Sequence, residues 1–163
     1  MNYPKVPAKR NDSDLLLTVE RDVRAPIEVV FDVLTDFELF VELEEPVKKV
    51  ITDPKLIKGK GYKSRWEMEN PESGAKWSCD EEILHFERPY QYAYAGHGAN
   101  GNDYTGVHTL NSNHDGSTHH EFNEVFHFDA DRSVFLAVLN RLVDNVKKEA
   151  EKDIKKRVNK HRH

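Results

Sequence analysis

The chain has 163 residues, of which 37% are hydrophobic and 33% are charged, and its net charge is −5 at pH 7. This length suits one domain with its own core, and the longest apolar run falls far short of the roughly 20 residues of a membrane-spanning helix. The negative charge gives no general attraction to nucleic acid or to an anionic membrane, so we expect neither nucleic-acid binding nor stable membrane anchoring.

The first residues lack the periodicity of a helix or strand, which predicts a disordered tail at 1–13 before a single domain at 14–160. The same segment has no apolar stretch of the kind found in secretory signals, so we expect a cytoplasmic protein. The first regular element is a strand from Leu15 to Val23, where apolar and β-branched residues partly alternate.

Two short helices are predicted after this strand. Pro26 suits the first turn of a helix, and the apolar residues that follow it recur at helical spacing as far as Leu34. Asp36 can cap a second short helix, which Pro46 ends.

Six further strands and one long helix complete the chain. The predicted strands are 47–52, 61–69, 76–87, 90–96, 103–111 and 118–128, separated by turn residues. Such short connections favour an antiparallel meander. From Phe135 to Val158 apolar residues step by three or four, which predicts a helix of about seven turns with Asp131 or Ser133 as its cap. Only its first half is richly apolar, so this half should lie on the sheet.

This order of elements resembles the START-like superfamily (SRPBCC), also called the polyketide cyclase/dehydrase and lipid-transport superfamily. The stretches that carry the resemblance are VERDVRAPIEVVFDVLTDFELFVEL, KGKGYKSRW and EEILHFERPYQYAY. The resemblance covers residues 15 to about 158. It implies an α+β helix-grip fold, in which a curved antiparallel sheet of about seven strands wraps around the long C-terminal helix. It also implies a hydrophobic cavity between the sheet and that helix.

Alternation along each strand predicts which side chains face this cavity. In the strand 61–69, Tyr62, Ser64, Trp66 and Met68 share one face and four charged residues share the other, so the first set should point inward. Ile83, His108, Leu136 and Val143 are also expected to face inward. The predicted ligand-binding set is Tyr62, Trp66, Met68, Trp77, Cys79, Tyr92, Tyr94, Leu110, Phe122, Phe126, Phe135, Leu139 and Leu142.

The tyrosines in this set favour a ligand-holding cavity over a packed core. A buried tyrosine must find a partner for its hydroxyl, whereas phenylalanine would fill a core without that demand. Tyrosine and tryptophan also serve as ordinary core residues, so the packed core remains an alternative.

One group of polar residues is a candidate for catalysis. His120 and Glu124 share a face of the last predicted strand with Phe122 and Phe126, and His108 lies on the neighbouring strand. An acid beside an imidazole in an apolar pocket suits general acid–base catalysis, so His120, Glu124 and His108 are the candidate catalytic residues. The alternative is a buried structural pair whose members satisfy each other.

A shift of this strand by one residue would turn His119, Glu121 and His127 inward instead. We disfavour it because it would expose both phenylalanines. The nine histidines show no convincing zinc-ligand spacing, and the single cysteine, Cys79, excludes an internal disulfide framework and a multi-cysteine zinc site. We therefore expect no metal and no cofactor.

Three functions remain open on this evidence. The leading hypothesis is a protein that binds a small hydrophobic ligand, such as a lipid, a polyketide or an aromatic molecule. The second is a polyketide cyclase or dehydratase that uses the histidine–glutamate pair. The third is a protein-interaction module without a ligand, which would use the charged second half of the long helix. The sequence carries no signal for the oligomeric state.

Overall fold

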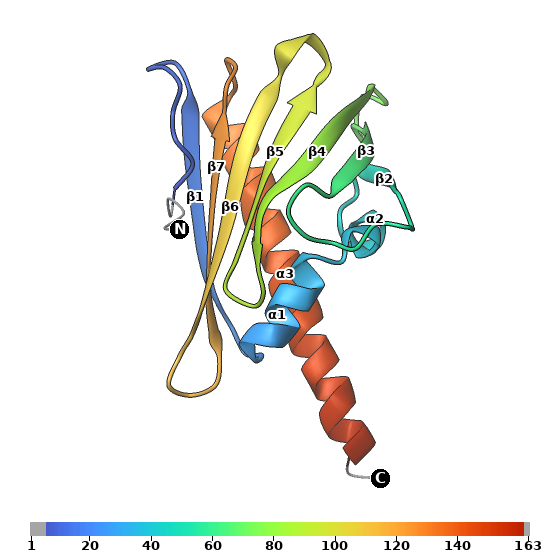
Figure 1. Ribbon diagram of the computed structural model, residues 1–163, viewed down its shortest axis with the longest axis vertical. Coiled ribbons are helices and arrows are strands. Elements are labelled where there is room, and N and C mark those ends of the chain that lie inside the picture. The colour runs from blue at the N-terminus through green and yellow to red at the C-terminus, as the bar shows by residue number, and fades with distance from the viewer. Residues whose placement is uncertain (1–5, 162–163) are drawn as a thin grey trace.

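A computed structural model describes residues 6–161, apart from the side chains of Asn100 and His161. It shows one seven-stranded antiparallel sheet that curves around a long helix (Figure 1). The strands are β1 (Leu15–Val23), β2 (Val47–Thr52), β3 (Lys63–Glu69), β4 (Lys76–Glu87), β5 (Gln91–Gly98), β6 (Asp103–Ser112) and β7 (Thr118–Phe126). The helices are α1 (Ile27–Leu34), η1 (Phe37–Leu39), α2 (Phe40–Leu43), η2 (Ala99–Gly101) and α3 (Arg132–His161). The predicted helix-grip fold is therefore confirmed.

The strand order is β1-β7-β6-β5-β4-β3-β2. Strands β2 to β7 follow one another as the predicted meander, while α1, η1 and α2 carry the chain from β1 to the opposite edge of the sheet. The boundaries differ slightly from those predicted, since β5 continues to Gly98 and β7 ends at Phe126. The first and last strands thus lie side by side.

Helices η1 and α3 begin with the aspartate caps that the sequence indicates. The Asp36 carboxylate accepts a hydrogen bond from the backbone N–H of Leu39, 3.3 Å away, and so caps η1. At the start of α3, Asp131 accepts hydrogen bonds from the N–H groups of Ser133 at 2.9 Å and Val134 at 3.3 Å. Of the two caps considered for the long helix, Asp131 is the one used.

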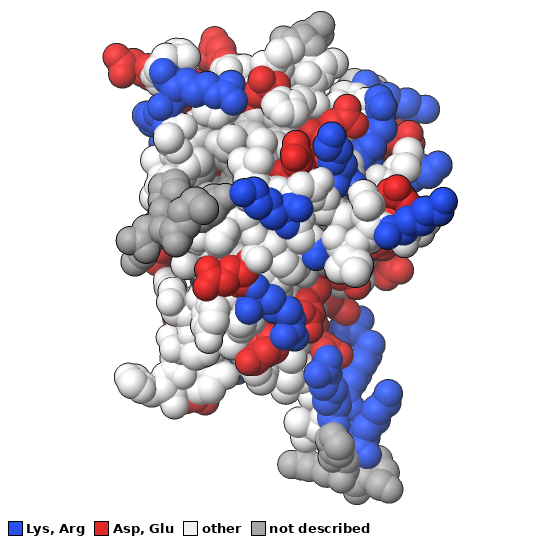
Figure 2. Space-filling model, in the orientation of Figure 1, with Lys and Arg blue, Asp and Glu red and all other residues white. Residues whose placement is uncertain are grey.

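Helix α3 has most of its close backbone neighbours in β1, α1 and α2. Its buried residues, Leu139, Val143, Val146 and Ala150, recur at helical spacing. The second half of the helix is largely exposed, and lysine and arginine side chains gather there in Figure 2. None of the described helices is both long enough and apolar enough to cross a membrane.

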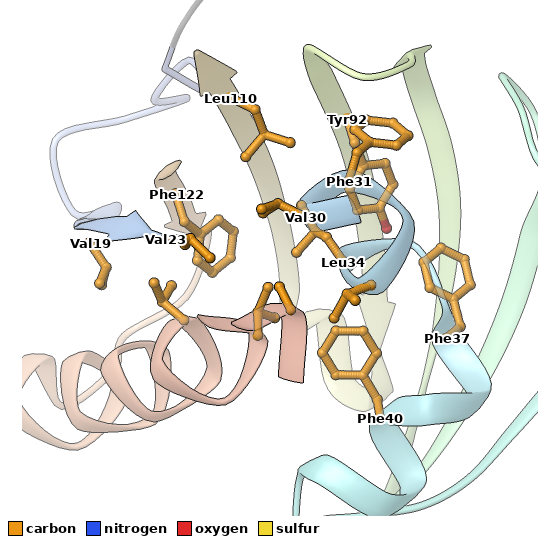
Figure 3. Close-up of a cluster of buried hydrophobic side chains, with 14 of the residues drawn as sticks. Val19, Val23, Val30, Phe31, Leu34, Phe37, Phe40, Tyr92, Leu110 and Phe122 are labelled. Atoms are coloured by element: carbon orange, nitrogen blue, oxygen red, sulfur yellow. The ribbon is translucent and has the colours of Figure 1, made fainter. Parts of the chain in front are cut away.

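The tightest part of the core lies beneath α1. Side chains from α1, β1, β7 and α3 meet there (Figure 3). Five of them have no exposed surface: Val23, Val30, Phe31, Phe122 and Val143. At roughly 25 cal/mol per Å² of apolar surface, this burial is the main favourable term for the fold. The concave face of the sheet is therefore closed on the side of α1.

Residues 6–14, which precede β1, are attached to the domain although they form no helix or strand. Pro7 is buried, and the Asp14 carboxylate accepts hydrogen bonds from the N–H groups of Arg10 at 2.6 Å and Asn11 at 3.3 Å. Nδ1 of the buried His127 lies 2.9 Å from the same carboxylate. The tail at 1–13 and the domain limits at 14–160 remain predictions, and residues 1–5 lie outside the described range.

The assigned face of α3 can be tested with two aspartates placed two residues apart. Leu139 is 4% exposed, so Leu139→Asp should destabilise the domain by about 3 kcal/mol or more, because it removes apolar contacts and buries an unpaired charge. Ala137 is exposed, and Ala137→Asp should stay within about 0.5 kcal/mol of the wild type. Urea unfolding measures both, and equal losses would contradict the assigned face.

Candidate functional site

The concave face is less tightly closed toward the start of α3, which lies at the end of the sheet away from α1 (Figure 1). Trp66, Glu81, Tyr104, Phe135 and Leu142 are only half-buried there, in contrast to the full burial beneath α1. We call this region the open half of the concave face. It combines aromatic and aliphatic side chains with a carboxyl and a phenol.

The first polar pair of the open half joins β5 to β7. The Tyr94 hydroxyl donates a hydrogen bond to Oε2 of Glu124, whose residue is 7% exposed. Burial raises the pKa of Glu124 to about 8, although the hydrogen bond from Tyr94 opposes this shift and the charge of Glu81 adds to it. The Glu124 carboxyl is therefore largely protonated at neutral pH.

The second polar pair joins β6 to β4. The Tyr104 hydroxyl lies 2.8 Å from Oε1 of Glu81 and 3.1 Å from Sγ of Cys79. Burial raises the pKa of Glu81 to about 7, against the hydrogen bond from Tyr104. Burial also raises the pKa of the Cys79 thiol to about 11, so this cysteine stays neutral and is a poor nucleophile.

The strand register explains how these pairs form. Each tyrosine lies opposite a glycine on the next strand, and the other cross-strand neighbour of that glycine is the carboxyl residue. The two rows are Tyr94–Gly106–Glu124 and Tyr104–Gly96–Glu81. The tyrosines therefore reach across the sheet in opposite directions.

Two histidines form a third polar pair. Nδ1 of His108 lies 3.0 Å from Nε2 of His120, and the His108 ring stacks on Phe122 at 4.0 Å and on Tyr92 at 5.5 Å between ring centroids. Burial lowers the pKa of both imidazoles, that of His120 to about 4, so both are neutral at pH 7. Nδ1 of His120 has no hydrogen-bond partner among the described residues.

The structure does not form the predicted pair of His120 and Glu124. Both side chains face inward as predicted, but residues four apart on a strand are separated by about 13 Å. Each is bonded to a residue of another strand instead, His120 to His108 and Glu124 to Tyr94. The register shifted by one residue would turn His119 inward, and it is not observed. Nδ1 of His119 lies 3.0 Å from Oδ1 of the exposed Asp22 instead.

Most residues of the predicted ligand-binding set do lie on the concave side. Trp66, Met68, Phe135 and Leu142 are half-buried, and the buried members are Tyr62, Cys79, Tyr92, Tyr94, Leu110, Phe122, Phe126 and Leu139. Trp77 differs from the other members of the set, because it is 45% exposed. It is the second residue of β4, and alternation gives the face of a residue without telling whether another element covers it. The role of all these residues in ligand binding remains a prediction.

Sequence reasoning missed Glu81 and Tyr104. Glu81 lies between Cys79 and Ile83 at a spacing of two, so the alternation that turned those residues inward also applied to it. Its place in the acidic run Asp80 to Glu82 hid that signal. Tyr104 shares its face with His108, four residues along β6.

A pocket of about 620 Å³ reaches Glu81 and Ser64 from the strands β2 to β5. Its other lining is mostly polar and includes Lys63, Arg65 and Asp80, with no residue of α3. It is therefore not the cavity predicted between the sheet and the helix, which remains a prediction. Within residues 6–161, no group of three or more histidine, cysteine, aspartate or glutamate side chains is arranged to hold a metal ion.

The fold and these pairs define a helix-grip domain with acid–tyrosine pairs on its concave face. The chain belongs to the family described as polyketide cyclase/dehydrase and lipid transport, whose model matches residues 15–159. The resemblance seen in the sequence is thereby confirmed. A comparison with curated proteins found no match.

Solved structures of several proteins share the fold. Protein CV1439 from Chromobacterium violaceum is 16% identical with a TM-score of 0.69, and the match covers 83% of this chain and 97% of that one. The Zhui aromatase/cyclase from Streptomyces sp. R1128 is 18% identical with a TM-score of 0.66, covering 86% and 96%. The di-domain ARO/CYC StfQ from the steffimycin biosynthetic pathway is 18% identical with a TM-score of 0.70, covering 86% and 46%. At these identities the likeness shows the fold alone.

The raised pKa of Glu124 predicts how stability depends on pH. The folded state binds the proton more tightly than the unfolded state, so the stability that the protonated carboxyl contributes is present below pH 4.5 and is lost as pH rises toward about 8. The variant Glu124→Gln has no carboxyl to ionise at this position, so it does not lose this stability. The unfolding free energy of the variant minus that of the wild type should therefore rise between pH 4.5 and 8. Thermal unfolding across this range measures the difference. A constant difference would contradict the shifted pKa.

Proposed function

We propose that this protein binds a small, mainly apolar ligand in the open half of its concave face, with polar atoms of the ligand at the two tyrosine–carboxyl pairs. The observation that carries the proposal is the presence of these carboxyl-containing pairs on a face that is otherwise mainly apolar. Removing a carboxyl from water is costly, and apolar side chains would fill the same space without that cost. Ligand pockets have this composition, with a few placed polar groups among apolar and aromatic side chains.

The protonation states define which ligand groups fit. A protonated Glu124 carboxyl can donate a hydrogen bond to a carbonyl or hydroxyl oxygen. Phe135, whose ring centroid lies 4.4 Å from that of Phe126, supplies apolar contact, and Trp66 and Leu142 are further half-buried apolar residues. A polyketide-like or other aromatic molecule with oxygen substituents meets both requirements. The family description, which includes lipid transport, and the two aromatase/cyclases of the same fold support this ligand class.

The two tryptophans allow a direct test of the binding region. Trp66 is half-buried on the concave face, where its Nε1 donates to Oγ of Ser64 at 2.9 Å, whereas Trp77 is 45% exposed. The apolar fluorophore N-phenyl-1-naphthylamine should bind at about one per chain and quench tryptophan emission, as expected of a pocket of roughly 300–1,000 Å³.

Trp77→Phe should keep most of this quenching, and Trp66→Phe should lose most of it. Fluorescence titration of the wild type and both variants measures the effect. Binding that quenches Trp77 alone, or no saturable binding of probes of several sizes, would contradict the proposed region.

A second candidate function is acid–base catalysis in the same region. The observation that favours it is the presence of two carboxyls whose pKa values, about 7 for Glu81 and about 8 for Glu124, lie near neutral pH and differ from each other. Such values suit a base and an acid. In the dehydration of a β-hydroxy ketone, the Glu81 carboxylate would take the proton next to the ketone. Glu124 would protonate the hydroxyl, which leaves as water while a carbon–carbon double bond forms.

The catalytic candidate predicts a separation of binding from turnover. Glu124→Gln and Glu81→Gln should each slow dehydration of an aryl β-hydroxy ketone by about 10²–10⁴-fold while probe affinity is retained. Glu82, the next residue along β4 on the opposite face, gives the matched control Glu82→Gln, which should leave the rate unchanged. Absorbance of the enone product measures turnover. Equal rates in all four proteins would leave ligand binding as the function.

A further inference from the structure

Two glycines on the concave face lie directly beneath the rings of the site tyrosines. A Cβ atom added to Gly106 would lie 2.5 Å from Cζ of Tyr94 and 2.6 Å from its hydroxyl oxygen. A Cβ atom added to Gly96 would lie 2.0 Å from Cζ of Tyr104. These distances are far shorter than van der Waals contact. Any other residue at either position would push the tyrosine ring off the sheet.

Backbone conformation does not account for these glycines. Neither has a positive φ, unlike Gly61, Gly74 and Gly116, which lie in turns or loops. Glycine in the interior of a strand is unfavourable, and it often marks a place where another group approaches the backbone closely. Here the group that approaches is a tyrosine ring.

Distance explains why the rings must lie so low. Neighbouring strands are about 4.8 Å apart, so each carboxyl residue is about 10 Å from its tyrosine across the intervening strand. A tyrosine hydroxyl covers most of this gap only when its ring lies flat over that strand. A glycine at the crossing point permits this, and both crossings have one.

We infer that Gly96 and Gly106 are positioning residues of the proposed ligand site, which hold each tyrosine hydroxyl on the carboxyl two strands away by leaving room for its ring. The importance of this arrangement for a ligand rests on the proposed function, but the positioning itself is measurable without one. A displaced Tyr94 ring would leave Glu124 without its hydroxyl donor. The ring would also move toward α3 and narrow the open half.

Carbon-13 NMR titration of the glutamate carboxyls tests the positioning, with the Glu124 signal assigned by its absence in Glu124→Gln. Because the Tyr94 hydrogen bond lowers the pKa of Glu124, Tyr94→Phe should shift that titration upward. Gly106→Ala should produce a similar upward shift, and the double variant should shift no further than either single variant. An unchanged Glu124 titration in Gly106→Ala would overturn the inference, as would additive shifts.

Gly59→Ala is the matched control. A Cβ atom on Gly59 would meet nothing within 4 Å, and its φ is not positive, so this variant should leave the titration and the melting temperature unchanged. A general effect of replacing glycine by alanine would appear in both variants.

A loss of stability in Gly106→Ala is also informative. If the clash with the ring causes it, then Gly106→Ala should lower the melting temperature less in a Tyr94→Leu background than in the wild type. The same loss in both backgrounds would overturn the inference. Gly106→Ala should also weaken binding of N-phenyl-1-naphthylamine. Failure of the wild type to bind this probe would count against the proposed function while leaving the carboxyl titration as the test of positioning.

Discussion

The pairing of β5 with β6 decides which groups share the concave face. In this register Tyr94 lies opposite Gly106, and Gly96 lies opposite Tyr104. A shift of one strand by a single residue would turn its tyrosine to the outer face and leave a carboxyl without its donor. A buried polar group without a partner costs about 1–3 kcal/mol, so the pair of Tyr94 with Glu124 opposes such a shift. The polar contacts and the apolar inner face thus favour the same register.

The two halves of the concave face have different physical roles. Beneath α1, side chains such as Val30, Phe31 and Phe122 are fully buried, and their contacts stabilise the fold. Toward the start of α3, half-buried Trp66 and Tyr104 leave part of the inner face accessible. Apolar burial in the closed half offsets the cost of removing the carboxyls of the open half from water. This division agrees with the position of α3, which has most of its close backbone neighbours in β1 and the short helices.

Much of this arrangement was predictable because helices and strands have fixed periods. Alternation gave the inward faces of Tyr94 and Glu124, and helical spacing gave the buried face of α3 around Leu139. Alternation describes one strand at a time, however. It could not show that His120 would meet His108 rather than Glu124, because cross-strand partners depend on register. The exposure of Trp77 depends on what covers its strand end, which no local pattern encodes.

The positions of the polar pairs favour a role in ligand binding over a role in stability. A desolvated pair of polar groups is often no more stabilising than apolar residues of the same size, so a domain selected for stability alone has little reason to keep two. In the closed half, the buried polar pair is His108 with His120, and both imidazoles are neutral there. The pair of Glu81 with Tyr104 occurs instead where both residues are half-buried and remain accessible, whereas Glu124 and Tyr94 are buried on the same face. Glu81, whose carboxyl can give or take a proton near neutral pH, is thus placed where a small molecule could reach it.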